Sequence, residues 1–246
     1  MSETMDMQAV RQDQETGATQ VHGVIDLRAY AARVAPTRDW LTGRAAPAFA
    51  DDAAAVVAIA PVAEGRVAAL PADEFVIVLS GELTFETARG AAAIKTGRSV
   101  VLPAGLGFAW RAAAGTVAVI VACPSSSGTA TDLVPIEEAA PLVASKPPLA
   151  DLLVGPTPSC RNHTDYGSAN GEFVCGTWDS TPYHRRPMPY RHIELMHLLD
   201  GAVTFEDASG SVTFSKGDVF LAARGAQCAW ISAVHVKKVY AIHRPA

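Results

Sequence analysis

The stretch EFVIVLSGELTFETARGAAAIKTGRSVVLPAGLGFAW at residues 74–110 recurs as ELMHLLDGAVTFEDASGSVTFSKGDVFLAARGAQCAW at residues 194–230, at an offset of 120 positions and without a gap. Twelve of the 37 aligned pairs are identical, among them four glycines and the closing tryptophan. Glycines that keep their register over this length indicate turns at the same places in both copies. Because an offset of 120 residues is the size of a whole domain, the repeat predicts two copies of one domain.

Turn-forming residues punctuate each copy about every 8 to 12 positions. Pro71, Gly81 and Gly90, for example, bracket short segments that are rich in β-branched and aromatic residues, such as residues 75–79. This spacing is typical of an all-β barrel or sandwich rather than of alternating strands and helices.

The chain divides into four predicted parts. Residues 1–20 lack hydrophobic periodicity and are expected to form a flexible N-terminal tail. Residues 21–124 and 161–246 are expected to form the N-terminal and C-terminal domains. Residues 125–160, which are rich in Pro, Ser and Ala, are expected to connect them.

The composition argues against several kinds of partner. The net charge is -5, and no run of Lys and Arg exceeds a pair, so we expect no nucleic-acid partner. No apolar run approaches the roughly 18 residues of a membrane span, and residues 1–20 are polar and acidic, so we expect no membrane partner and a cytoplasmic location. The four cysteines form no CxxC pair and are expected to be reduced thiols.

Conserved-looking spacings in both copies resemble the two motifs of the cupin superfamily. A Glu followed by a Gly seven positions later (Glu74 and Gly81, and again at 194 and 201) resembles the end of the first motif. Gly97, Pro103 and Gly105 resemble the second motif. Two such units look like a bicupin, which implies an all-β fold of two tandem double-stranded β-helix (jelly-roll) barrels, each with a small site in its mouth.

The motif spacing, together with the tryptophan that closes each unit, is most similar to the cupin subgroup named after (S)-ureidoglycine aminohydrolase. That resemblance implies a hydrolase-like reaction on a small nitrogenous substrate. It also favours a homodimer, although a monomer is equally compatible with two barrels that cover each other's sheets.

The N-terminal copy lacks a metal-ligand set. Cupins usually bind a divalent metal through a His-x-His pair, the motif-one Glu and a His three positions after the motif-two Gly. The pair is missing here, Phe108 stands at the last position, and only Glu74 remains. We therefore expect no metal in this barrel and expect Glu74 to pair with a nearby Arg or Lys, because one carboxylate binds metal poorly.

The C-terminal copy is more polar. His192 and Glu194 share one face of a strand because side chains alternate, and His197 lies on the other face. By resemblance, His192, Glu194 and Cys228 would converge in the barrel, with His184 one strand upstream. This set predicts one divalent metal (Zn, Mn, Fe or Ni). Two alternatives stay open. His192 and Glu194 hydrogen-bond each other while the Cys is simply buried, or Lys238 pairs with Glu194 and replaces the metal.

Residues 183–191 form a dense cationic and aromatic stretch in an otherwise acidic chain. Because arginine binds carboxylates with two hydrogen bonds, this stretch favours an organic acid or a ureido compound as ligand; a solvated loop of surface ion pairs is the alternative. The residues expected to contact the ligand are Tyr183, Arg191, Trp178, Trp230 and Lys238.

Two classes of function remain from the sequence. In the first, the C-terminal barrel is a metal-dependent hydrolase-like enzyme that acts on a small polar molecule. In the second, neither barrel is catalytic and the chain is a small-molecule-binding or structural bicupin without metal.

Overall fold

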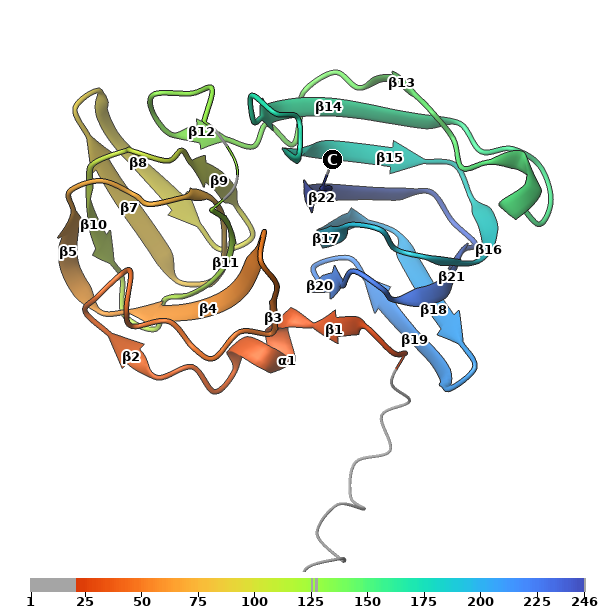
Figure 1. Cartoon of the computed structure of the whole chain (residues 1–246), viewed down its shortest axis with the longest axis horizontal. Helices are drawn as coiled ribbons and strands as arrows, with labels where there is room; N and C mark the ends of the chain where they lie inside the picture. The colour runs from red at the N-terminus through yellow and green to blue at the C-terminus, as the bar shows by residue number, and fades with distance from the viewer. Residues whose placement is uncertain (1–20, 125, 127, 246) are drawn as a thin grey trace, which may run out of the picture.

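The computed structural model describes residues 21–124, 126 and 128–245. The tail predicted for residues 1–20 lies outside the described residues. Two barrels of strands lie side by side, with the N-terminal barrel on the left of Figure 1 and the C-terminal barrel on the right. The helices among the described residues are α1 (Leu27–Ala31) and the short 3-10 helix η1 (Ala150–Leu152), and none of them is long and apolar enough to cross a membrane.

Each barrel consists of two sheets that face each other. The strands of the N-terminal barrel are β2 (Pro36–Thr37), β3 (Phe49–Ala50), β4 (Ala55–Pro61), β5 (Ala63–Val67), β6 (Asp73–Ser80), β7 (Glu82–Thr87), β8 (Gly90–Lys95), β9 (Ser99–Leu102), β10 (Phe108–Ala112), β11 (Val117–Cys123) and β12 (Val134–Pro135). The strands of the C-terminal barrel are β1 (Val24–Asp26), β13 (Val143–Ser145), β14 (Cys160–Gly167), β15 (Phe173–Ser180), β16 (Tyr183–Pro189), β17 (Ile193–Asp200), β18 (Ala202–Asp207), β19 (Gly210–Ser215), β20 (Val219–Ala222), β21 (Gln227–Ser232) and β22 (Val236–His243).

The two barrels share one strand order. In the N-terminal barrel the sheets run β9-β6-β11-β4 and β5-β10-β7-β8, and in the C-terminal barrel they run β20-β17-β22-β15 and β16-β21-β18-β19. Strands β6 to β9 begin and end 120 residues before β17 to β20. The prediction of an all-β fold of two tandem jelly-roll barrels is therefore confirmed.

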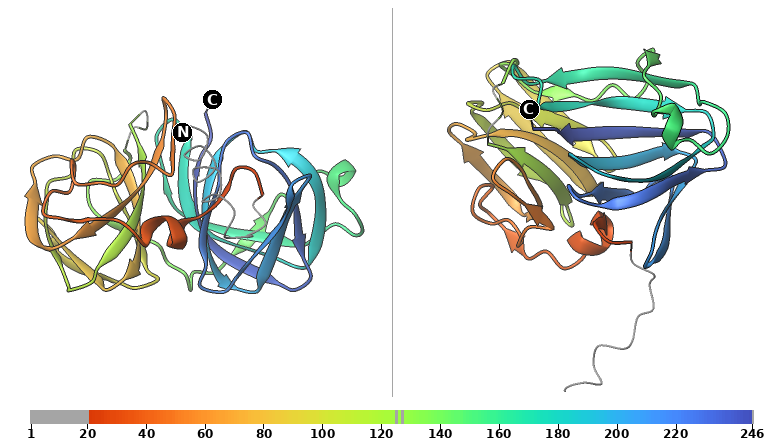
Figure 2. Two further views of the ribbon diagram at one scale, coloured as in Figure 1. Left: turned by 90° about the horizontal axis from the view of Figure 1, so that it is seen from below. Right: turned by 45° about the vertical axis from the view of Figure 1, so that its right-hand side comes forward.

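The N-terminal segment crosses from one barrel to the other. β1 pairs with β20 of the C-terminal barrel, with Val24 opposite Ala222. Arg28 on α1 donates to the carbonyl of Gly217 (2.9 Å) and to that of Leu79 (3.3 Å), one in each barrel. Figure 2 shows this segment running between the barrels.

Strand pairings of two kinds cross the predicted domain limits. The range 21–124 includes β1, whose strand partner is in the C-terminal barrel. The connecting range 125–160 is not purely a linker, because it supplies β12 to one barrel and β13 to the other. The sequence repeat could not reveal these pairings, because it begins at residue 74 and relates only the central strands.

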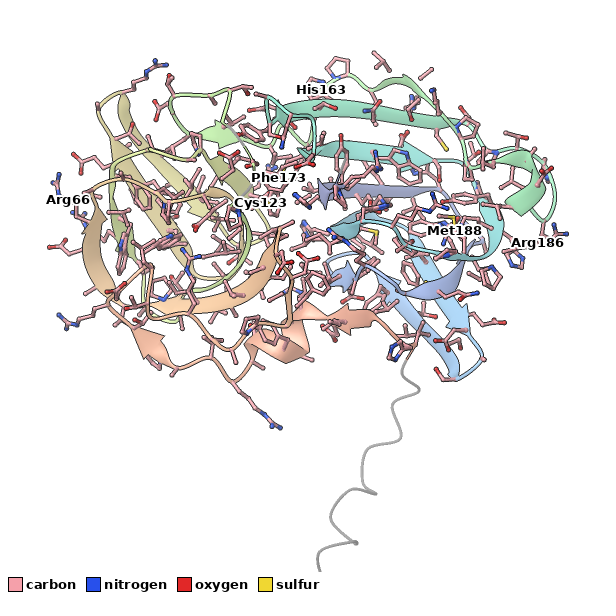
Figure 3. The ribbon with its side chains drawn as sticks, viewed as in Figure 1. Arg66, Cys123, His163, Phe173, Arg186 and Met188 are labelled. Atoms are coloured by element: carbon pink, nitrogen blue, oxygen red, sulfur yellow. The ribbon has the colours of Figure 1, made fainter. Side chains whose placement is uncertain are left out.

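Side chains alternate between the two faces of each central strand, so that one face packs inside a barrel and the other packs in a core between the barrels. On β6, Val76 and Val78 pack inside the N-terminal barrel, whereas Phe75 and Ile77 pack between the barrels. On β17, Leu195 joins the same core between the barrels, together with Cys123 and Phe173, which Figure 3 labels where the two barrels meet. Both faces of these strands are thus apolar, as expected for strands buried on both sides.

His197 is a polar residue of this inter-barrel face. It is 6% exposed, and a Cβ placed on Gly97 of the other barrel would lie 3.8 Å from its Cε1 atom. Burial, with a smaller contribution from the nearby Arg28 and Arg98, lowers the pKa of His197 to about 4. The residue is therefore neutral at pH 7 and packs at the interface between the barrels.

Candidate functional site

A cavity of about 570 Å³ opens in the mouth of the C-terminal barrel. Strands β14, β15, β16, β17 and β22 supply its walls, and residues 145–152 of the connecting segment border its rim. Side chains that alternate inward along β22 bring Lys238, Tyr240 and Ile242 to the cavity. The cavity is therefore where this barrel places its polar residues.

An ion pair lies at the floor of the cavity. Lys238 stands opposite Leu198 on the neighbouring strand, and its side chain extends past Met196, whose Sδ is 3.1 Å from Nζ. The Nζ atom of Lys238 lies 2.7 Å from Oε1 of Glu194, and the side chains of Lys238 and Glu194 are both about 90% or more buried. The other oxygen, Oε2, lies 3.5 Å from Nε2 of His192.

The pair shifts the titration of Glu194. Burial by itself raises the pKa of this carboxyl, but the charge of Lys238 and the hydrogen bond with His192 outweigh burial and lower the pKa to about 2. Glu194 is therefore an anion at pH 7, compensated by the ammonium beside it.

Two tryptophans enclose the ammonium. Lys238 Nζ lies 4.8 Å from the ring centroid of Trp178 and 4.9 Å from that of Trp230. Tyr183 stacks on Trp230 with the centroids 5.7 Å apart. Four of the predicted ligand contacts thus form one cluster, within which Trp178 and Lys238 border the cavity itself. Cation–π contacts and the carboxylate together fix the position of the ammonium.

The structure does not bring the four predicted metal ligands together. His192 and Glu194 are adjacent, but Cys228 lies in the apolar core under the cavity, and burial raises the pKa of its thiol to about 11. His184 alternates with the inward-facing Tyr183 and does not border the cavity. Among the described residues, no group of three or more His, Cys, Asp and Glu side chains is arranged to hold a metal ion.

The chemistry of the donor set also fits a metal poorly. Glu194 already has an ammonium at hydrogen-bonding distance, so its charge is compensated without a metal. A divalent ion there would meet the like charge of Lys238 within a few ångströms. Of the alternatives considered from the sequence, the geometry matches the ion pair between Lys238 and Glu194, and the hydrogen bond between His192 and Glu194 accompanies it.

Arg191 does not border the cavity. It is exposed, whereas Arg185, on β16, is 8% exposed and borders the cavity. The signal that could have found it is the period of two: Tyr183 and Arg185 share a face, whereas Arg186 projects from the outer end of the barrel, as Figure 3 shows.

Arg185 is only partly satisfied by its surroundings. Its Nη2 donates to the carbonyl of Cys228 (3.0 Å), and its Cζ lies 5.1 Å from the ring centroid of Tyr190. Its Nε has no hydrogen-bond partner within the part of the chain that the structure describes. The nearby carboxylate of Glu194 is engaged by Lys238 and His192 instead.

The corresponding space in the N-terminal barrel is filled. Trp40 is 2% exposed and packs edge-on against Phe85 and Phe108, with centroid distances of 5.4 and 5.8 Å. Its Nε1 donates to Glu74 (3.1 Å), and Arg44 pairs with the same carboxylate at 2.6 Å. The expectation that Glu74 pairs with an arginine is confirmed.

Comparisons with known proteins agree with the fold. Residues 167–240, within the C-terminal barrel, match the model of the EutQ-like cupin domain. This match and the cupin-fold structures described next support the cupin superfamily. No functionally curated protein has a sequence significantly similar to this chain.

Three solved structures resemble most of the chain. A protein of unknown function from Pseudomonas syringae, assigned to the DUF861 family, is 28% identical, with a TM-score of 0.78 over 83% of this chain and 88% of that one. A cupin 2 conserved barrel domain protein from Leptotrichia buccalis is 9% identical, with a TM-score of 0.55 over 92% and 98%. The protein Ylba from E. coli, also of DUF861, is 12% identical, with a TM-score of 0.55 over 96% and 98%. The last two show the fold alone.

Proposed function

We propose that the C-terminal barrel binds a small organic anion in its cavity and does so without a metal. The observation that carries this proposal is the ion pair between Lys238 and Glu194, with Nζ 2.7 Å from the carboxylate at the cavity floor. The ammonium supplies the positive charge that a metal supplies in other barrels of this type. The N-terminal barrel, whose interior Trp40 fills, serves as a structural partner.

The charges around the cavity favour an anion. Four cationic side chains border it, Lys146, Arg185, Lys238 and Arg244, against two acidic ones, Glu172 and Glu194. Histidine apart, four minus two leaves two positive charges without an acidic counterpart in the wall. A carboxylate is a suitable counter-ion, because guanidinium and carboxylate form charge-assisted hydrogen bonds.

Polar groups of the wall suit the rest of such a ligand. Tyr240 and Thr164 share a hydrogen bond of 3.1 Å between their hydroxyls, and Asn162 lies beside them on β14. These groups can donate and accept, so an organic acid or a ureido acid, the classes favoured by the sequence, can form hydrogen bonds along its length.

Calorimetric titration of the full chain tests the proposal. The probes are acetate, succinate, hydantoate and phenylacetate, each compared with its neutral amide. We expect at least one acid to bind with a Kd below about 1 mM, roughly -4 kcal/mol, and its amide to bind more weakly. Failure of every acid, or amides that bind as well as acids, would overturn it.

Three further expectations accompany this proposal. The bicupin relationship to the ureidoglycine aminohydrolase subgroup, the cytoplasmic location and the homodimer stay predictions from the sequence. The enzymatic alternative is a hydrolase activity in the cavity, and this activity requires a divalent metal bound there.

A further inference from the structure

We infer that the ligand is a carboxylate with a compact apolar body, aromatic or branched aliphatic, whose carboxylate binds Arg185. This inference rests on the proposed function and adds the ligand class and the residue that selects it. It joins two observations: a buried arginine in the cavity wall that has no carboxylate at ion-pair distance among the described residues, and an apolar rim made by the segment that connects the barrels.

Arg185 is a buried cation of the cavity wall for which no carboxylate of the described residues lies at ion-pair distance. Lys238 has Glu194 at 2.7 Å, whereas Arg185 has a carbonyl and an aromatic ring as neighbours. An arginine that is 8% exposed and lacks a carboxylate is costly to bury, because its charge is only weakly compensated. A carboxylate from the ligand would complete the site, and the planar guanidinium suits it geometrically.

The rim provides apolar surface for the rest of the ligand. Pro147, Pro148, Leu149 and Leu152 border the cavity from the connecting segment, and Trp178 faces it from β15. Leu149 is 74% exposed, so this apolar side chain stays in water when the cavity is empty of ligand. Covering such a surface with an apolar group is favourable, at about 25 cal/mol for each Å² removed from water.

The rim is held in place by the same strand that carries the arginine. The backbone of Leu153 forms a bridge with that of Arg185, and Val154 N donates to the carbonyl of His184 at 2.9 Å. Arg186 donates from Nη1 to the carbonyl of Asp151 at 3.0 Å. The carboxylate-binding group and the apolar rim therefore keep a fixed separation, which limits the ligand to an acid with a short body.

Binding of three matched probes to the full chain tests the ligand class. Phenylacetate carries both features, acetate lacks the apolar body, and phenylacetamide lacks the charge. We expect phenylacetate to bind at least about tenfold more tightly than either of the others. If acetate bound as tightly as phenylacetate, the ligand would not need an apolar body. If phenylacetamide bound as tightly as phenylacetate, the ligand would not need a carboxylate. Either result would overturn the inference.

Variants of two arginines test which residue gives the preference for a carboxylate over its amide. Arg185→Met is expected to remove the preference for phenylacetate over phenylacetamide, whereas Arg191→Met, at the exposed arginine, is expected to retain it. The reverse result would overturn the role of Arg185. Arg185→Lys keeps the positive charge but loses the planar guanidinium, and it is expected to retain only part of the preference for phenylacetate. This variant tests the role of Arg185 even if Arg185→Met does not fold.

The rim has its own variant. Leu149→Ser is expected to weaken phenylacetate several-fold and to leave acetate unchanged. An unchanged affinity for phenylacetate would overturn the role of the rim. If hydantoate or succinate binds more tightly than phenylacetate, this inference fails while the proposed function stands; if no acid binds at all, both fail.

Discussion

Glu74 and Glu194 occupy the same position of the two barrels, and each buried carboxylate is held by one cation and one ring nitrogen. Arg44 and the indole of Trp40 hold Glu74, at 2.6 and 3.1 Å. Lys238 and His192 hold Glu194, at 2.7 and 3.5 Å. The partners come from unrelated places in the chain, so the shared requirement is charge compensation of a carboxylate at this point of the barrel.

Removal of one member of the floor pair is expected to destabilise the protein strongly. Lys238→Met leaves Glu194 buried without its cation, which costs about 3–5 kcal/mol of unfolding free energy. The double variant Lys238→Met/Glu194→Gln is expected to recover most of this loss, because no charge is then left unpaired. Urea unfolding measures both. The matched control is Arg111→Met, which breaks an exposed pair with Glu64 and should cost less than about 1 kcal/mol. A Lys238→Met cost no larger than this control would contradict the assignment.

Glu194 is expected to control stability in acid. Its pKa is lowered in the folded protein from 4.5 to about 2, so its contribution is fully present above pH 4.5 and is lost as the pH falls to 2. The contribution corresponds to about 3 kcal/mol. Glu194→Gln should therefore flatten the stability profile between pH 4.5 and 2.

The equivalent residue of the other barrel is the control for this profile. Burial raises the pKa of Glu74, although Arg44 and Trp40 oppose the shift. Its protonation therefore adds stability as the pH falls, and Glu74→Gln should not flatten the acid limb. Identical profiles for the two variants would show that the ion pair with Lys238 does not depress the pKa of Glu194.

His197 is expected to act in a different pH window. Its pKa is lowered from 6.5 to about 4, so the stability from keeping it neutral is present above pH 6.5 and is lost as the pH falls to 4. His197→Ile, which places the residue of position 77 in the second copy, should remove this loss. Chemical unfolding at pH 7, 5.5 and 4 checks it. A wild-type stability that is constant over this range would contradict burial of His197 at the interface.

Metal analysis distinguishes the proposed site from the one that the sequence predicted. Purified and dialysed protein is expected to contain less than about a tenth of an equivalent of Zn, Mn, Fe or Ni, since retention requires a complete ligand set. One full equivalent that His192→Asn and Glu194→Gln abolish would instead establish the metal site and make the hydrolase alternative the better one.

The tryptophan in the N-terminal barrel is expected to be a major source of stability. Trp40→Ala leaves a cavity among Phe85, Phe108 and Trp110, at a cost of about 3–5 kcal/mol. Added indole should refill the space and raise the unfolding temperature of the variant but not of the wild type. Trp178→Ala, at the edge of the open cavity, should cost less. No response to indole would indicate that the barrel collapses around the missing ring.

The architecture could be predicted from the repeat because glycines and alternating side chains act locally. Gly81 and Gly201, for example, both take positive φ angles in turns, at 74° and 79°, in equivalent hairpins. The pairing of β1 with β20 could not be predicted in this way, because the two strands are almost 200 residues apart and no local pattern reports the pairing.

The candidate site was partly predictable. Alternation correctly placed His192 beside Glu194, and the ion pair with Lys238 was one of the alternatives considered. The sequence does not decide between that pair and a metal. The decision depends on how the long side chain of Lys238 extends past Met196 to Glu194, and no spacing of residues in the sequence specifies this conformation. The sequence does not favour Arg185 over Arg191, because a bulge in β16 lies between them. The bulge, between Arg185 and Met188, interrupts the alternation of side chains, so counting in steps of two does not show which arginine faces inward.

The place of β1 at the start of the chain, with its partner in the C-terminal barrel, determines what can be isolated. A fragment that starts at residue 161 would lack both outermost strands of its larger sheet, β1 and β13, and would leave β20 with an open edge. It would also lose the rim of the cavity, which precedes it in the chain. The smallest unit in which the pocket is whole therefore begins before β1 and reaches the last strand, so that half-length versions of this protein would report on an incomplete receptor.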